Sequence, residues 1–495
     1  MLWWQNLPFF SIMLCLVSAA VCSILPWRAA RTLSFSSLAL CLSASITLLF
    51  FFRSTNAPSF TFLMGHFPAP WGNEIRAGQL EAFLAILFPL VMLCALAAGG
   101  SDPILLAHKN RVRLFYVLCL LLMAALLSQI YSNDLFTCYV FLEIMTLTSC
   151  GLLVAKDSGK ALAAGMRYMV LNLVGSGLFL LGVVLLYDLT GHLLMVPLNV
   201  QVQNLFLSGA HHRSLTMILT LITVGLSIKS ALFPFHSWVP DAYSSGFPAS
   251  NAILSSLVSK GYIILLLKTY VRIFGWDLIA SSRVNHMLLL FASLGMIIGS
   301  LAAWRTNSLT RMVAWSSVSQ IGYIYLGIAL GSAQGYQAAL FHLTVHSLSK
   351  SLLFLSSSVL SSAAGSEKLS HLQGAARRHR LAGICWSVGA CSIVGLPFTG
   401  GLVSKLLLGN AALIHSAPVA AAVLILLALS TFLNVLYFLR TALSLWAPSK
   451  VPSATVVSFR PAEVFPCAVL AFLVILTFMA ASPILSVLSH GLTQF

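Results

Sequence analysis

The sequence has few charged side chains, and this scarcity excludes an ordinary soluble protein. Only 8% of its 495 residues are charged and 59% are hydrophobic, so a soluble fold of this length would lack a polar shell. Acidic residues are the rarest, with 11 Asp and Glu against 27 Lys and Arg. Long apolar runs recur from end to end, each near the roughly 20 residues that cross about 30 Å of hydrocarbon. The pattern predicts an all-α polytopic membrane protein.

Other absences narrow the chemistry. The ten cysteines lie singly in apolar runs without a C-x-x-C pair, and no Gly-rich phosphate loop follows a strand pattern. We therefore expect no disulfide, no metal and no bound cofactor in this chain, and no redox or hydrolytic site. If the protein serves a redox system, the redox centres lie in other subunits. The alternating pattern of an outer-membrane barrel is also missing.

The apolar runs predict about fourteen transmembrane helices. Their expected ranges are 8–25, 32–52, 79–99, 114–132, 134–154, 162–187, 214–238, 249–271, 285–304, 311–331, 336–362, 381–413 (interrupted), 418–446 and 464–488.

The basic residues indicate how these spans are oriented. Seventeen of the 27 Lys and Arg fall in odd-numbered connections and five in even-numbered ones. The positive-inside rule then places the odd connections in the cytoplasm and both termini on the outer side of the inner membrane. The net charge of +16 is therefore explained by basic residues in the cytoplasmic connections, and we expect no nucleic-acid partner. The N-terminal apolar run lacks the basic n-region of a signal peptide and is interpreted as a retained first span.

Ionisable groups inside the spans are the candidate functional residues. One carboxylate, Glu143, lies mid-span, together with five lysines: Lys229, Lys260, Lys268, Lys350 and Lys405. A charge at the centre of a helix costs about 2.5–3.5 kcal/mol on insertion scales, so a sequence seldom keeps several without use. Lys268 is near the outer boundary and is expected to snorkel to the interface. Glu143 has a structural alternative, as a partner that holds one lysine and locks two helices together.

Two histidines share a helix face with one of these lysines. His342, His346 and Lys350 follow one another at intervals of four residues in "HLTVHSLSK". A zinc site is disfavoured because no carboxylate or thiolate nearby in the sequence would complete it. Burial of the imidazoles for packing is one interpretation. A hydrated polar stripe that relays protons is the interpretation we favour.

Two spans are interrupted beside a lysine. Pro234 follows Lys229 by five residues, and Pro397 precedes Lys405 by eight within the Gly-rich stretch "GLPFTGG". Irregular backbone at membrane depth is tolerated where it is enclosed by protein or lines a wet cavity. The two spans cross in opposite directions, so each lysine falls on the same side of its break, as in the inverted repeats of transporters. Two unrelated proline kinks are the alternative.

These residues resemble a known family. The stretch "SIKSALFPFHSWVPDAYSSGFPASNAILSSLVSKGY" is similar to the core motif of the antiporter-like subunits of respiratory complex I. The same family supplies large subunits of Mrp-type cation/proton antiporters and of the membrane arms of energy-converting hydrogenases. "LEIMTLTSC", "RMVAWSSVSQIGY", "LFHLTVHSLSKSLLFL" and "GLPFTGGLVSKLLL" match further motifs in the expected order.

The resemblance implies two inverted five-helix repeats, the fourth to eighth and ninth to thirteenth spans. We accordingly divide the chain into 1–105, 106–275, 276–447 and 448–495. The resemblance also implies roles for single residues: Glu143 pairs with Lys229, Lys260 bridges to His346 and Lys350, and Lys405 lies at the outward exit.

The chain also departs from the family in places. Arg76 and Gly78 stand where relatives more often have an acidic and a small residue, which affects the outer side. The chain is expected to have no lateral helix after its last span, and "MGHFPAPWGNEIR" looks closest to the D-type subunit of Mrp antiporters.

The resulting hypothesis is lateral proton transfer along Glu143, Lys229, Lys260, the His342–His346–Lys350 stripe and Lys405. The expected partners are other membrane subunits, and either a peripheral redox module or exchange against Na⁺ would drive transport. A stand-alone secondary transporter of a cation or organic solute is the alternative function. A structural subunit with vestigial charges is a third possibility.

Overall fold

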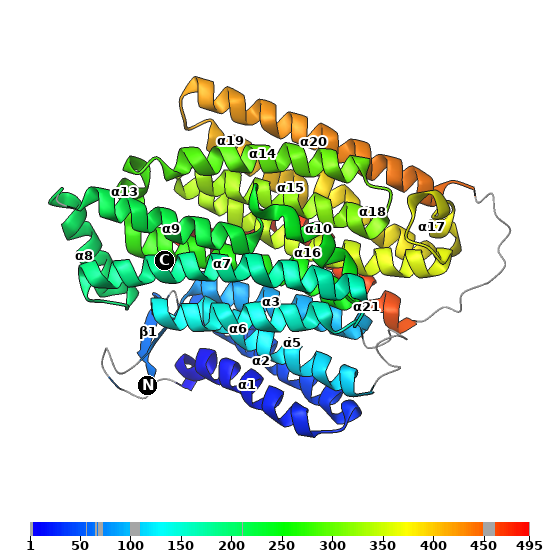
Figure 1. Cartoon of the computed structure of the whole chain (residues 1–495), viewed down its shortest axis with the longest axis horizontal. Helices are drawn as coiled ribbons and strands as arrows, with labels where there is room; N and C mark the ends of the chain where they lie inside the picture. Colours follow the sequence, from blue (N-terminus) through cyan, green and yellow to red (C-terminus); the bar gives the residue numbers. More distant parts are fainter. Residues whose placement is uncertain are drawn as a thin grey trace.

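The computed structural model is a bundle of long helices that lie side by side, joined mostly by short connections (Figure 1). It describes residues 3–55, 57–64, 67, 73–99, 109–209, 211–448 and 461–494. The domain boundary predicted at 105–106 lies outside these residues, as does most of the "MGHFPAPWGNEIR" motif.

Every predicted span coincides with helical structure. The first half contains η1 (Trp3–Asn6), α1 (Leu7–Ile24), α2 (Trp27–Thr55), α3 (Gln79–Gly99), α5 (Lys109–Tyr131), α6 (Leu135–Val154), α7 (Gly159–Thr190), α8 (Met195–Leu207), α9 (His212–Ser230), η3 (Phe235–Trp238), α10 (Val239–Ser245), α11 (Pro248–Ile253), η4 (Leu254–Val258), α12 (Ser259–Thr269), η5 (Tyr270–Phe274) and α13 (Gly275–Ser281). The second half contains α14 (Val284–Arg305), α15 (Leu309–Ala329), α16 (Ala333–Ala364), η6 (Leu369–His371), α17 (Ala375–Arg378), α18 (Arg380–Val394), α19 (Gly400–Ala412), α20 (Ala417–Trp446), α21 (Pro461–Met479) and α22 (Ala481–Thr493).

Ten of the described helices are long and apolar enough to cross a membrane, or eleven if the bent pair α21–α22 counts as one span. The chain is thus a multi-pass membrane protein, while the count of fourteen stays a prediction.

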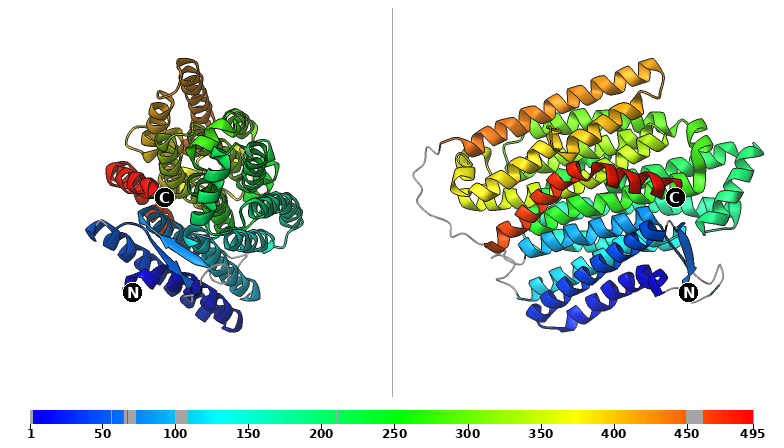
Figure 2. Two further views of the ribbon diagram at one scale, coloured as in Figure 1. Left: turned by 90° about the vertical axis from the view of Figure 1, so that its left-hand side faces the viewer. Right: turned by 180° about the vertical axis from the view of Figure 1, so that it is seen from behind.

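One end of the bundle carries structure that the sequence did not predict. Strands β1 (Phe60–Leu63) and β2 (Glu74–Ala77) pair antiparallel, so the fold is not purely α-helical. Helix α8 forms where a loop was expected, between α7 and α9. Both termini lie at the same end as the hairpin and α8 (Figures 1 and 2).

Helix ends follow ordinary capping chemistry. Asp134 accepts a hydrogen bond of 2.6 Å from the Thr137 amide at the start of α6, and Ser158 caps α7 in the same way. Ser332 accepts from the Gly335 amide at the start of α16. A short polar side chain satisfies an amide that has no partner within the helix, which fixes where these spans begin.

Both predicted helix interruptions are present. Helix α9 ends at Ser230, Ala231 has a left-handed φ of 68°, and the chain resumes in η3 and α10. Helix α18 ends at Val394, Gly395 has φ 84°, and α19 begins at Gly400.

Two features were not anticipated: π-helical turns η4 and η5 on either side of α12, and a 75° bend between α21 and α22. Such π-turns often mark functional sites.

The centre of the bundle is α16. Its most apolar stretch is buried throughout, whereas only about a third of the corresponding stretch of α20 is. Helix α16 packs against α15, α18, α19 and α21, so its polar residues face protein rather than lipid.

The helix that carries Lys229 is also tightly held. A Cβ on Gly175 of α7 would come within 2.8 Å of the Gly225 carbonyl of α9, and one on Gly225 within 2.7 Å of the Gly175 carbonyl. Only glycine permits this approach of the two backbones.

Candidate functional site

Lys229 lies at the end of α9, just before the break, with 0% of its surface exposed. Its Nζ donates a hydrogen bond of 2.7 Å to Oγ1 of Thr146 on α6 and lies 5.2 Å from the centre of the Tyr262 ring on α12. The Tyr262 hydroxyl in turn lies 3.1 Å from Thr146 Oγ1. The ammonium is thus surrounded by neutral polar groups and an aromatic face, which attracts cations.

Glu143, the partner that the resemblance implies, lies one turn before Thr146 on α6 and is partly buried. It forms no direct ion pair with Lys229, whose hydrogen bond goes to Thr146 instead. Because Lys229 binds Thr146, the carboxylate one turn away on the same helix lies in the neighbourhood of the ammonium. Contact between the two groups would therefore require a movement of one side chain.

Lys260 and Lys350 are brought together by α15. Lys260 is fully buried and donates to the Ser255 carbonyl in η4 and to Ser259 Oγ at 3.1 Å. Lys350 of α16 is also fully buried and donates to Ser316 Oγ and, at 2.9 Å, to the Val313 carbonyl.

The link between them is a pair of adjacent serines. Ser316 Oγ accepts a hydrogen bond from Lys350, and Ser317 Oγ lies 3.0 Å from Ser255 Oγ. The backbone carbonyl of Ser255 in turn accepts a hydrogen bond from Lys260. The sequence reasoning missed these serines, although they stand in the quoted "RMVAWSSVSQIGY". Serine is common in membrane helices and usually bonds its own backbone, so its presence alone carries little signal.

The two histidines continue the series along α16. His342 Nδ1 lies 2.9 Å from Ser404 Oγ, and the rings of His342 and His346 are 6.3 Å apart. Both side chains are buried. His342 Nε2 and both ring nitrogens of His346 have no hydrogen-bond partner among the described residues. Buried polar atoms without a protein partner are the usual positions of internal water.

Lys405 of α19 completes the series beyond the second break. Its Nζ donates to the Val394 carbonyl at 2.7 Å and to Thr431 Oγ1 of α20 at 3.0 Å. The ammonium lies 5.1 Å from the centre of the Tyr323 ring, which itself stacks on His342 at 5.4 Å. The structure thus connects Lys405 to the histidine stripe through one aromatic ring.

The prediction for Lys268 was wrong. The side chain has 0% exposure, so its ammonium is enclosed by protein and does not extend into solvent. Its Nζ donates instead to the carbonyls of Gln129, Ile130 and Ser132, where α5 ends. A cation there satisfies free carbonyls and complements the negative end of the helix dipole. Lys268 is therefore a helix cap.

A buried ion pair was also missed. Arg272, which the sequence placed in an outer connection, is 5% exposed and binds Glu81 of α3, which is 3% exposed. Arg272 further contacts Asn133, whose amide donates to Glu74 of β2. Glu81 is near the start of its span, so position alone did not mark it as buried. Its pairing with Arg272 joins α3 to the end of the eighth predicted span.

Lys229, Lys260, Lys350 and Lys405 contact no carboxylate of the described residues. Among the described residues the ion pairs are Arg111–Asp157, Arg167–Asp241, Arg311–Asp241 and Arg272–Glu81. An ammonium that is buried without a carboxylate is costly, so the neutral amine is a competitive alternative. Groups of this kind are suited to taking up and releasing protons.

Comparison with known proteins gives a consistent result. The family described as NADH:quinone oxidoreductase/Mrp antiporter, TM, matches residues 132–434. NADH-quinone oxidoreductase subunit N of Desulforudis audaxviator is 34% identical over 383 residues, covering 77% of this chain and 74% of that protein. The D-type subunit of the Na(+)/H(+) antiporter of Alkalihalophilus pseudofirmus is 27% identical over 374 residues, covering 75% of this chain and 74% of that protein.

The fold has a solved counterpart. A chain of the Mrp complex from Dietzia sp. superposes with a TM-score of 0.86 at 23% identity, covering 100% of this chain and 97% of that one. The expected family is confirmed: this chain belongs to the NADH:quinone oxidoreductase/Mrp antiporter transmembrane family and is an antiporter-like membrane subunit.

Proposed function

We propose that this subunit moves protons laterally through the membrane interior along Glu143, Lys229, Lys260, Lys350, His346, His342 and Lys405. The observation that carries the proposal is a set of amines, fully buried at Lys229, Lys260 and Lys350 and partly buried at Lys405, that contact hydroxyl groups and no carboxylate of the described residues. A fixed structural role would favour direct ion pairs, of the kind that Arg272 forms with Glu81.

Polar side chains lie between several neighbouring residues of this series. Thr146 and Tyr262 connect Lys229 to α12, which also bears Lys260. Ser316 and Ser317 lie between Lys260 and Lys350. Beyond Lys350, the free ring nitrogens of His346 and His342 would hold water and pass protons towards Tyr323 and Lys405.

Aqueous access would come from a cavity of about 410 Å³ at the end of the bundle away from the termini. Asn251, Phe354, Ser361 and Glu367 line it, and Phe354 is one helical turn from Lys350. Asn251 Oδ1 and Ser361 Oγ are buried and without a partner among the described residues, as expected where water enters.

The wider setting is also part of the proposal. Fourteen spans, inverted repeats over 106–275 and 276–447, and an inner-membrane location with both termini outside would fit the family. The relatives named above and the Mrp complex suggest that this chain works beside other membrane subunits, with a redox module or Na⁺ exchange supplying the drive.

Lys229→Ala tests the proposal. It should abolish proton transport in membrane vesicles, by about 100-fold or more, because it removes one proton carrier from a series. Lys160→Ala is the matched control, since Lys160 is exposed in the first turn of α7 and takes no part in the proposed series.

Both variants should insert and keep the partners that copurify with the wild type. Full transport by correctly assembled Lys229→Ala protein would refute the proposed pathway.

A further inference from the structure

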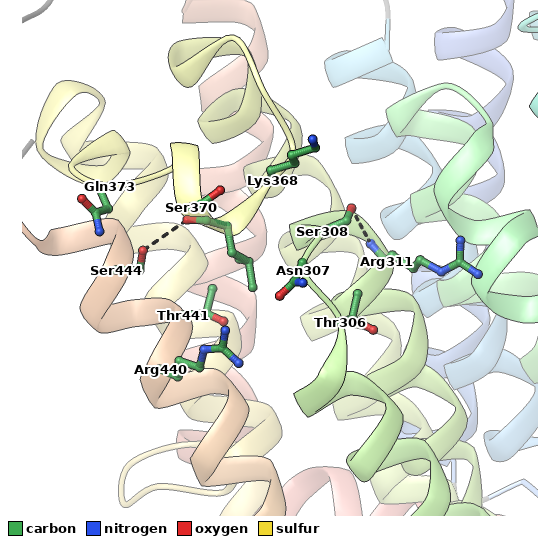
Figure 3. A pocket seen from close by; sticks show the side chains of 11 residues that line it. Thr306, Asn307, Ser308, Arg311, Lys368, Ser370, Gln373, Arg440, Thr441 and Ser444 are labelled. Carbon is green, nitrogen blue, oxygen red and sulfur yellow. Dashed lines mark hydrogen bonds between the residues drawn. The ribbon is translucent and has the colours of Figure 1, made fainter. Parts of the chain in front are cut away.

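A polar cavity lies at the end of the bundle away from the termini, apart from the proposed proton axis. Its volume is about 800 Å³, and it is bounded by three segments: the turn between α14 and α15, the η6 segment and the last turns of α20 (Figure 3). Arg311, Lys368 and Arg440 each come from a different segment.

The cavity is electropositive. It has three basic side chains and no Asp or Glu among its lining residues, and the nearest carboxylate on that wall, Glu367, lies 3.5 Å from Ser308 Oγ just outside it. Arg311 is partly compensated, at 3.0 Å from Asp241 beyond the cavity. Arg440 donates only to the neutral Trp304 carbonyl, at 3.3 Å, and Lys368 forms none of the ion pairs found among the described residues.

Neutral hydrogen-bonding groups fill the space between these charges. Asn307 and Ser308 stand on one wall, and Gln373 and Ser444 on the other (Figure 3). The Ser308 hydroxyl already contacts the Arg311 amide and Glu367, and the Ser444 hydroxyl donates to the Leu369 carbonyl. Lys368, the Arg440 guanidinium and the side-chain amides of Asn307 and Gln373 are the groups that can donate to a phosphate oxygen. The cavity is therefore suited to an anion that accepts several hydrogen bonds.

An apolar stripe on α20 leads away from this cavity. Ile425, Phe432, Leu439 and Leu443 are each more than half exposed, at 67%, 59%, 53% and 64%, and their spacing puts them on one face of the helix. The stripe reaches Arg440 at the cavity. Trp304, at 43% exposure, lies beside the same arginine, and tryptophan is enriched at the membrane interface.

We propose that the cavity binds the phosphodiester head group of an anionic phospholipid, with its acyl chains lying along the α20 stripe. The head group would be held at the cavity that Lys368 and Arg440 both line, and its acyl chains would lie along the exposed apolar face of α20 that begins beside Arg440. A small phosphate ion would use only the cavity. An acidic protein segment would leave the stripe uncovered.

Binding of phosphatidylglycerol to the full chain, purified with the partners that accompany it and stripped of native lipid, tests this assignment. Native mass spectrometry would measure its occupancy against phosphatidylcholine. The wild type should prefer phosphatidylglycerol. Lys368→Gln and Arg440→Gln should each lower that preference about fivefold, the effect of one basic side chain near a membrane surface.

Arg28→Gln is the matched control. Arg28 is exposed on α2 and does not line the cavity, so its loss should leave the preference unchanged. Leu443→Ser adds a second arm, because it should weaken retention of the lipid but not of inorganic phosphate.

Three outcomes would overturn the proposal. In the first, the double variant Lys368→Gln/Arg440→Gln keeps the wild-type preference. In the second, inorganic phosphate displaces phosphatidylglycerol at equal concentration. In the third, the complex with its native partners excludes the lipid while the chain alone binds it, which would assign the cavity to an acidic segment of a partner.

Discussion

The two interrupted helices place a lysine in matching surroundings. Lys229 binds a threonine at 2.7 Å and lies 5.2 Å from a tyrosine ring, and Lys405 binds a threonine at 3.0 Å and lies 5.1 Å from another. In both places the helix that carries the lysine is broken by a residue with positive φ, Ala231 or Gly395. The two ammonium groups thus have the same kinds of neighbours, a threonine hydroxyl and a tyrosine ring.

The sites differ in what lies beyond the threonine and the tyrosine. Lys229 has a carboxylate nearby, Glu143 on the helix of its threonine. Lys405 has instead the Val394 carbonyl and a tyrosine that stacks on His342. The charge around Lys229 can change when the Glu143 carboxylate moves towards it or away from it. The charge around Lys405 can change only when its own amine gains or loses a proton. This contrast suggests that the first site is the switch and the second a relay.

The largest effect should come from removing the second lysine. Lys405→Ala should lower proton transport in vesicles about 100-fold, as much as Lys229→Ala, because both stand in one series. Lys405→Arg, which keeps the charge but does not release a proton at neutral pH, should be equally inactive. Substantial transport by Lys405→Arg would show that this site needs only a fixed charge.

A smaller effect is expected at the carboxylate. Glu143→Gln keeps the shape of the side chain but removes its field at Lys229, and we expect transport to fall about tenfold, one pKa unit's worth of interaction. The double variant Glu143→Gln/Lys405→Ala should be no worse than Lys405→Ala alone. Unaltered pumping in an assembled Glu143→Gln protein would instead support the structural role of this residue.

The smallest effects should come from the tyrosines. Tyr262→Phe and Tyr323→Phe keep the ring that faces the ammonium and lose only a hydroxyl, a net loss of about one hydrogen bond and roughly fivefold in rate. The two variants should behave alike if the two lysine sites are equivalent in this respect. A much larger loss for Tyr323→Phe, measured in the same vesicles, would mean that its hydroxyl carries the proton between His342 and Lys405.

The sequence identified those parts of the site that conflict with a lipid environment. Lys229, Lys260 and Lys350 were predicted as candidates because a central lysine is costly in hydrocarbon, and all three are buried. Pro234 and Gly395 similarly indicated the helix breaks. These residues can be recognised in a single sequence because a charge or a helix-breaking residue is unfavourable in the middle of a membrane span.

The sequence did not reveal features that depend on which helices meet. Ser316 and Ser317 look ordinary until the fold sets α15 against Ser255 of η4 and Lys350 of α16. Lys268 was misjudged because its depth was measured along its own helix, whereas the nearest polar groups belong to the end of α5. Helix α8 was missed because its thirteen residues are too short for a span, so they looked like a loop.

The buried contact between Arg272 and Glu81 has a consequence for how the chain can be shortened. It fastens the N-terminal helices to the core through a guanidinium that is almost fully buried. Deleting residues 1–99 would remove Glu81, and removing the carboxylate from a buried ion pair costs about 3–5 kcal/mol where the cation stays buried. Residues 1–99 are therefore not an independent domain. A shortened form of this subunit must either keep them or replace Arg272 as well.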